Sequence, residues 1–250
     1  MKTKGNVIRR AAYSLDYRIS NSVIDYRIKV DPAFGVIDNP SEIIRVPVER
    51  ITHQCISDEV KDLRRCKSLL FHQTIYRDGN IAGGNWDLQK KLYDKNKYLV
   101  ILKERFVEKK EWENTLYYQV FHTTKDKGRK YRNRKSWEEF KRTYLNSCDK
   151  LFHDIKENGY KSNYEITGNP QKEVIVCISR SGEIMRPPMG GGNHRFAIAK
   201  ILGLKEIPVV VSVWHKMYID GLKKHPTIRE ITPKTTIQPI LEGKIPFTGG

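Results

Sequence analysis

The sequence predicts an α+β protein in which a small mixed β-sheet carries an inserted helical subdomain. Residues 24–30 alternate apolar and polar side chains, a period that is typical of a half-buried strand. Two apolar runs, at residues 173–180 and 207–213, have the length and the β-branched content of buried strands. Residues 137–158 instead repeat apolar side chains at helical spacing and end at Gly159, which predicts an amphipathic helix.

Composition shifts along the chain divide it into five segments. We expect a polar N-terminal arm (1–22), the first strands of the core (23–59), a helical insertion (60–140), the remainder of the core (141–216) and an irregular tail rich in Pro, Thr and Lys (217–250). Within these segments, residues 42–48 predict a Pro-containing edge strand. A helix is expected from Ser57 to about residue 70, and residues 88–124 have a helical texture.

The chain is strongly basic, with a formal net charge of +17 over 250 residues. Such a balance predicts an anionic partner: nucleic acid, a nucleotide, a phosphorylated substrate or a membrane surface. No apolar run is long enough for a membrane-spanning helix, and no apolar region follows the basic start as in a secretory signal. Four widely spaced cysteines with no zinc-ligand spacing predict reduced thiols in a cytoplasmic protein.

A glycine-rich loop, Gly190-Gly191-Gly192-Asn193-His194-Arg195, is the most informative stretch. Its glycines allow a ligand close to the backbone, and Asn193 is a favoured N-cap for the short apolar helix that follows. The start of a helix offers unpaired N–H groups and a partial positive charge, which suit a phosphate. Arg195 can hold phosphate through two hydrogen bonds, and His194 can donate to it or act as acid or base. The alternative is a tight turn without a ligand.

The pattern around this loop resembles the ParB/sulfiredoxin superfamily over residues 145–215. A helix ending in Gly159, a strand, the loop, a small-residue helix ending at Gly203 and an Ile207-Pro208 strand follow one another as in that family. The resemblance implies a nucleotide-handling protein that uses ATP or CTP with Mg²⁺. It also implies that Gly191, Gly192, His194 and Arg195 contact phosphate while Asn193 caps the helix.

Two departures from the family pattern narrow the implied activity. Sulfiredoxins carry their catalytic cysteine at the position of Asn193, and an amide cannot replace a sulfur nucleophile, so sulfinic-acid reduction is excluded. His194 replaces the first arginine of the pair found in partition proteins, and no convincing helix-turn-helix follows Val213. A role in DNA partition is therefore disfavoured.

Phosphoryl transfer usually needs a carboxylate for Mg²⁺ or for the acceptor, and the sequence offers two candidates. Asp87 ends a second glycine-rich loop, residues 83–87, where it is a candidate metal ligand or base, with Trp86 as a stacking wall. An ordinary loop with Asp87 as a helix N-cap is an equal alternative. Glu183, upstream of the first glycine-rich loop, is the rival carboxylate, and its alternative is a solvated turn residue.

A basic segment, residues 125–135, carries seven Lys or Arg residues in eleven. Most such runs are solvated loops, but a tyrosine among cations can stack on a base while its neighbours bind phosphates. The candidate nucleic-acid contacts are Lys127, Arg129, Lys130, Tyr131, Arg132 and Arg134.

Taken together, these patterns lead to three hypotheses. The first is a nucleotide-binding phosphotransferase or NTPase that passes the γ-phosphate to water or to a small-molecule acceptor such as a sugar, with the inserted helices forming the acceptor pocket. The second is a basic nucleic-acid-binding protein or nuclease. The third is a nucleotide-gated interaction module without turnover.

Overall fold

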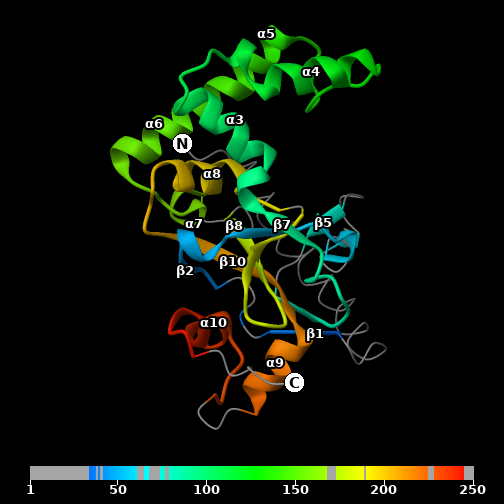
Figure 1. The fold of residues 1–250 in the computed structure, drawn as a ribbon, viewed down its shortest axis with the longest axis vertical. Helices are drawn as coiled ribbons and strands as arrows, with labels where there is room; N and C mark the ends of the chain where they lie inside the picture. Colours follow the sequence, from blue (N-terminus) through cyan, green and yellow to red (C-terminus); the bar gives the residue numbers. More distant parts are fainter. Residues whose placement is uncertain are drawn as a thin grey trace, which may run out of the picture.

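The computed structural model describes residues 34–37, 39, 42–60, 65–67, 74–76, 79–167, 173–188, 190–224 and 228–244. A mixed β-sheet occupies the middle of the molecule (Figure 1). Helices α3 (Lys97–Phe106), α4 (Leu116–Asp126), α5 (Trp137–Phe140) and α6 (Asn146–Asn158) form an arm beyond one end of the sheet. Helices α9 (Lys216–Lys223) and α10 (Pro233–Leu241) lie at the other end.

In the described residues, the main sheet has eight strands, with the long strand β10 (Glu206–His215) near its centre. They are β1 (Phe34–Val36), β2 (Ile44–Pro47), β3 (His53–Cys55), β6 (Asn80–Ala82), β7 (Lys90–Leu92), β8 (Val174–Ile178), β9 (Ile184–Arg186) and β10 (Glu206–His215). Their order is β1-β6-β10-β8-β9-β3-β7, with β2 paired antiparallel to the first half of β10. Strand β10 runs parallel to both β6 and β8, whereas β8 and β9 are antiparallel. Strands β4 (Arg65–Lys67) and β5 (Thr74–Tyr76) form a separate pair.

The two apolar runs in the sequence form the centre of this sheet. Every residue of β8 is buried, and every residue of β10 after Glu206 is buried. The register between these strands shifts between Val211 and Val213, where the Ser212 hydroxyl donates to the carbonyl of Val176 at 3.0 Å. The predicted strands at 173–180 and 207–213 and the α+β class are therefore confirmed.

The predicted helix over residues 137–158 is present, with one irregularity. The Ser136 hydroxyl caps its start by accepting from the N–H of Glu139, and Gly159 ends it at a φ of 77°. Residues 141–145 form a π-helical turn between α5 and α6. Buried Phe140, Cys148 and Phe152 line the face that packs inward, as the helical spacing predicts.

The segment 60–140 is not a purely helical insertion. It contributes β6, which pairs with β10, and the exposed edge strand β7, so in the continuous described stretch from residue 79 the first α-helix is α3, which begins at Lys97. Strand β4 also interrupts the helix expected to run from Ser57 to residue 70. Strands of three residues are too short to show an alternating pattern, so they could not be predicted from the sequence. One hydrophobic core extends from β8 through α8 (Asn193–Ile201) into the arm.

The described part of the C-terminal segment is largely helical rather than irregular. Thr232 and Thr235 form a capping box, and Pro233 occupies the first turn of α10, where a proline is favourable. The Pro- and Thr-rich composition that suggested an irregular tail is here a helix start signal. The arm expected over residues 1–22 and the strand expected over residues 24–30 lie outside the described residues. Among the described helices, none is long and apolar enough to cross a membrane.

Candidate functional site

The glycine-rich loop joins β9 to α8, and its backbone differs in one respect from the prediction. Gly192, at a φ of 74°, occupies the N-cap position, and Asn193 is the first helical residue. The side chain of Asn193 turns back into the loop: its Oδ1 accepts from Arg186 at 2.8 Å and its Nδ2 donates to the carbonyl of Gly190 at 3.3 Å. Asn193 therefore closes the loop instead of capping α8. Gly192 has no side chain to cap the helix, so as far as the described residues go, its first N–H groups keep their capacity to bind an anion.

Only glycine fits at position 192. A Cβ atom there would lie 2.6 Å from the Cα of Val174 and 2.7 Å from its Cγ2. The loop thus lies directly on the start of β8, and the positive φ is the conformation that glycine adopts without strain.

Arg186, the last residue of β9, anchors the glycine-rich loop through hydrogen bonds. Its guanidinium is buried and donates to the carbonyl of Gly191 and to Asn193 Oδ1, each at 2.8 Å, and to the carbonyl of Ile175. The same group lies 5.5 Å from the ring of Phe196 on α8. Sequence reasoning missed this residue, although a charged side chain inside an apolar strand just before a glycine loop is a usable signal.

His194 points to the helical arm and lies among three tyrosines, Tyr98, Tyr117 and Tyr144, which we call the tyrosine cluster. Its Nε2 lies 2.7 Å from the hydroxyl of Tyr117 and 3.2 Å from that of Tyr144, and its ring meets Tyr98 edge to face at 5.0 Å. Burial, with a smaller effect from Arg132, lowers the pKa of His194 to about 4. His194 is therefore neutral near pH 7 and is not a cationic phosphate ligand.

Arg132 reaches this cluster from the basic segment. It donates to the hydroxyl of Tyr98 at 2.8 Å, and its guanidinium lies 4.5 Å from the ring centre of Tyr144. Burial raises the pKa of both Tyr117 and Tyr144, so these hydroxyls remain protonated donors at neutral pH. The structure thus brings one of the predicted nucleic-acid contacts to the predicted phosphate loop.

Arg195 lies in a second buried group with Tyr160 and Glu173, which we call the Arg195 cluster. Arg195 Nη1 is 3.9 Å from Glu173 Oε2, too long for a hydrogen bond, and its guanidinium lies 6.0 Å from the ring of Tyr160. Among the described residues, no hydrogen bond of normal geometry is formed by these two buried atoms or by the buried hydroxyl of Tyr160. Burial raises the pKa of Glu173, although the N–H of Tyr164 partly offsets it by donating to Oε1. Neither Tyr160 nor Glu173 stood out in the sequence.

Asp87 does not lie near the glycine-rich loop at residues 190–195. Its carboxylate accepts from the backbone N–H and the guanidinium of Arg180, which follows the far end of β8, and it lies 3.7 Å from His215 Nε2 at the end of β10. The loop at residues 190–195 instead lies on Val174, at the start of β8. The length of β8, about 13 Å at 3.3 Å per strand residue, separates this position from the end of the strand that Arg180 follows. Both carboxylate oxygens are occupied by Arg180, so Asp87 does not fit the role of a metal ligand for this loop.

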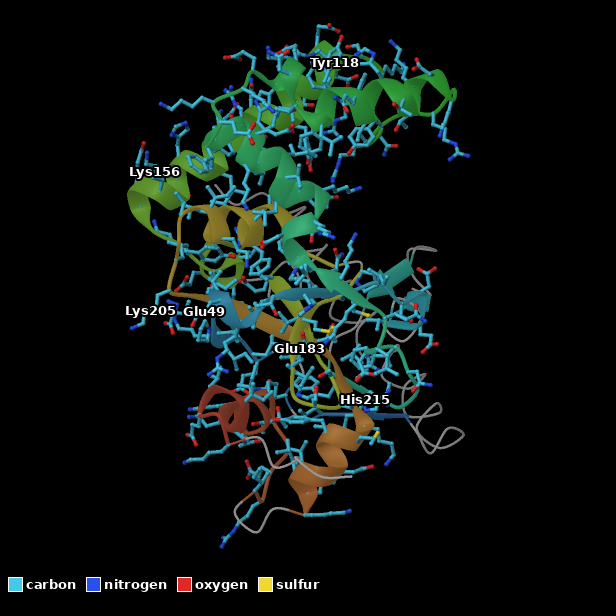
Figure 2. All side chains as sticks on the ribbon, viewed as in Figure 1. Glu49, Tyr118, Lys156, Glu183, Lys205 and His215 are labelled. Atoms are coloured by element: carbon cyan, nitrogen blue, oxygen red, sulfur yellow. The ribbon has the colours of Figure 1, made fainter. Side chains whose placement is uncertain are left out.

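Glu183 lies near the same end of β8 as Asp87. It precedes β9, whose Ile184 pairs with Ile178 at the end of β8. Its carboxylate forms an ion pair with Lys90 and lies 2.6 Å from His53 Nδ1. Figure 2 shows Glu183 and His215 between α8 and α9, with His215 beside α9. Neither predicted acid is brought together with His194 and Arg195.

We expect Asp87→Asn to change how the free energy of unfolding depends on pH in acid. Burial alone would raise the pKa of Asp87, but the hydrogen bonds from Arg180 outweigh it and hold the pKa below its ordinary value of 3.8. The charged pair then stabilises the fold fully above pH 3.8, and the stabilisation is lost as the pH falls through the lower folded-state value. The variant should lose about 1–2 kcal/mol at pH 7 and less at pH 3, measured by urea unfolding. Asp126→Asn, an exposed control, should show neither effect. A constant difference across this range would contradict the assignment.

The basic segment forms a pocket on the arm. Arg132 and Asn133 adopt positive φ values of 49° and 62° in a tight turn closed by a bridge between Tyr131 and Arg134. The turn directs Arg132 to the tyrosine cluster, as described above. A pocket of about 240 Å³, the basic pocket, is lined by Lys125, Arg129, Lys130, Arg134 and Lys135 together with Phe121, Tyr131 and Gly128. Lys127, also predicted as a contact, is not among its lining residues.

The described residues include no group of three His, Cys, Asp or Glu side chains that could hold a metal ion. Cys55, Cys148 and Cys177 are buried. No protein-family model matches the chain, and no match was found among curated proteins or solved structures.

Proposed function

We propose that the protein binds a nucleoside triphosphate and holds its phosphates at the N-terminus of α8. The observation that carries this proposal is the Arg195 cluster, where three buried polar atoms from separate segments form no hydrogen bond within the described part of the chain, beside a helix whose N-cap is Gly192. Buried polar groups are almost always satisfied, so such a concentration suits a polar ligand. Phosphate oxygens would accept from Arg195 and Tyr160, and the N–H groups of α8 favour the same charge.

Glu173 is compatible with an anion at this position. Since burial raises the pKa of Glu173, its Oε2 holds a proton more readily than an exposed carboxyl does. A protonated Oε2 can donate to a phosphate oxygen, and Oε1 already accepts from the N–H of Tyr164. The cluster would then offer three donors to one phosphate group.

Three features favour a nucleotide over inorganic phosphate. The tyrosine cluster borders the loop on the arm side, and aromatic rings with protonated hydroxyls suit a base or a ribose. Arg132 adds a cation whose described side-chain contacts are tyrosine rings and hydroxyls, so it keeps donors for a further phosphate. The similarity of the loop to the ParB/sulfiredoxin signature favours the same ligand class.

The proposed activity is transfer of the γ-phosphate to a small-molecule acceptor, such as a sugar, or to water. Asp87 and Glu183 are too far from the loop for this role, which leaves Glu173 as the carboxylate nearest to Arg195. A bound Mg²⁺ would be held chiefly by the phosphates and water, as is usual for this ion. If nucleotide binds without turnover, the same site serves as a nucleotide-gated module.

We expect ATP, CTP or GTP with Mg²⁺ to raise the thermal unfolding temperature, since a ligand at 100 times its Kd adds about 2.7 kcal/mol of stability. Arg195→Gln should weaken binding at least about tenfold, a change of about 1.4 kcal/mol, because it removes the charged donor. Arg45→Gln, a control at an exposed arginine of β2, should bind like the wild type. The proposal fails if no nucleotide stabilises the protein or if Arg195→Gln binds equally well.

Glu173→Gln separates binding from turnover. The amide keeps the shape of the side chain, accepts from the N–H of Tyr164 and donates from its NH₂ group as a protonated carboxyl does, so nucleotide affinity should hold or increase. Phosphate release, measured by a coupled assay, should then fall if Glu173 orients the acceptor. Undiminished turnover in Glu173→Gln would remove the carboxylate from the proposed mechanism but leave the nucleotide site intact.

A further inference from the structure

The positive charge of the helical arm is concentrated in one place. Outside residues 125–135, the arm from Lys97 to Asn158 is balanced, with nine Lys or Arg and nine Asp or Glu residues. Residues 125–135 themselves carry seven cationic residues against a single carboxylate, Asp126. In the described part of the chain, none of the seven has a carboxylate within ion-pair distance. A cationic surface of this kind is not explained by internal ion pairing.

Five of these cations line the basic pocket, and the backbone that carries them has a defined course. The tight turn at Arg132 and Asn133 fixes the course of the segment, and the guanidinium of Arg134 is anchored to the hydroxyl of Thr143 at 3.3 Å. Tyr131 packs edge to face on Phe140 at 5.3 Å and on Phe121 at 6.1 Å, which fixes its ring at the wall of the pocket. Aromatic wall and cationic rim are therefore both preformed.

We infer that the basic pocket is a binding site for single-stranded nucleic acid. Cations along the rim would follow the phosphates, and the ring of Tyr131 would stack with one unpaired base. The volume of about 240 Å³ lies below the usual range for complete small-molecule sites, which suits one inserted group of a longer chain. A duplex keeps its bases stacked and paired, so it cannot insert a base without cost. The inference does not depend on the nucleotide site at α8.

The test is the salt dependence of binding, measured on the full chain by fluorescence anisotropy with a labelled oligothymidylate of about 12 nucleotides. Between about 50 and 200 mM salt, log K should fall linearly with log salt concentration. The double variant Arg129→Gln/Lys130→Gln should reduce the magnitude of that slope by about 1.4, since each single-strand phosphate contact contributes about 0.7. Affinity at 0.1 M salt should fall about 25-fold, if the two lines meet at 1 M.

The matched control removes two cations from the same arm at another place. Lys150 and Lys156 are exposed on α6, which lies at the opposite end of the arm from α4 and α5 (Figures 1 and 2). Lys150→Gln/Lys156→Gln makes the same change in net charge and should leave the slope unchanged. An equal loss of slope in both double variants would assign the binding to overall charge and overturn the inference.

A second pair of variants tests the aromatic contribution. Tyr131→Leu should weaken binding roughly tenfold with little change in slope, because it removes stacking and no charge. Tyr131→Phe keeps the ring and its packing on Phe140 and should bind like the wild type. The inference is also overturned if the oligothymidylate does not bind at 50 mM salt or if a duplex of equal length binds as tightly.

Discussion

Gly192→Ala is expected to destabilise the protein by about 2–4 kcal/mol. Two physical effects add at this position. The residue has a φ of 74°, which costs an L-residue about 1–2 kcal/mol. The new Cβ would also lie 2.6 Å from the backbone of Val174, and a central strand cannot move aside without disturbing its partners β9 and β10. Urea unfolding at constant pH measures the loss.

Gly203→Ala separates these two effects. Gly203 also has a positive φ, 63°, but a Cβ there would meet no atom within 4 Å. Its substitution should therefore cost only the conformational strain, about 1–2 kcal/mol. If both variants lost the same stability, the close approach of the loop to β8 would not be a constraint on the fold.

His194→Gln is expected to flatten the pH dependence of stability on the acid side of neutrality. The folded-state pKa of about 4 lies below the ordinary value of 6.5, so the unfolded chain takes up the proton first. Stability is therefore fully present above pH 6.5 and is lost as the pH falls toward 4, by about 2–3 kcal/mol. In the variant this component is absent, while the amide can still bond to the hydroxyls of Tyr117 and Tyr144.

The measurement is chemical unfolding of both proteins at intervals from pH 7.5 to pH 4. At neutral pH the variant should be about 1 kcal/mol less stable, because the ring contact with Tyr98 is lost. The difference should shrink and then reverse in acid. His153→Gln is the control, because that side chain is 61 % exposed on α6 and its replacement should leave the slope unchanged. Parallel curves for wild type and His194→Gln would mean that His194 is not buried as a neutral ring.

The two proposed ligand sites share the basic segment. Arg132 turns inward to Tyr98 and Tyr144, next to His194, while its neighbours line the basic pocket. A ligand that moved Arg132 at one site would disturb the turn that shapes the other. Variants of either site should therefore be tested for ligand binding at the other site as well.

Much of the fold could be predicted from local patterns. The runs that became β8 and β10 are long and apolar, and the helix over residues 137–158 has a clear periodicity with a cap at each end. Short strands such as β6 and β7 could not be predicted, because three residues show no period and their pairing depends on distant partners. Helix α10 could not be predicted from composition, because Pro and Thr are typical of irregular segments, whereas here Thr232 and Pro233 start the helix.

The sequence by itself determined the glycine-rich loop, the helix behind it and the concentration of charge at residues 125–135, since these depend on neighbours in the chain. Only the tertiary structure decided which side chains share a site. It separated Asp87 and Glu183 from the loop by the length of β8, and it brought Tyr160, Glu173 and Arg195 together from three segments. The physical reason is that contacts across a sheet depend on strand order and direction, which no local spacing of residues records.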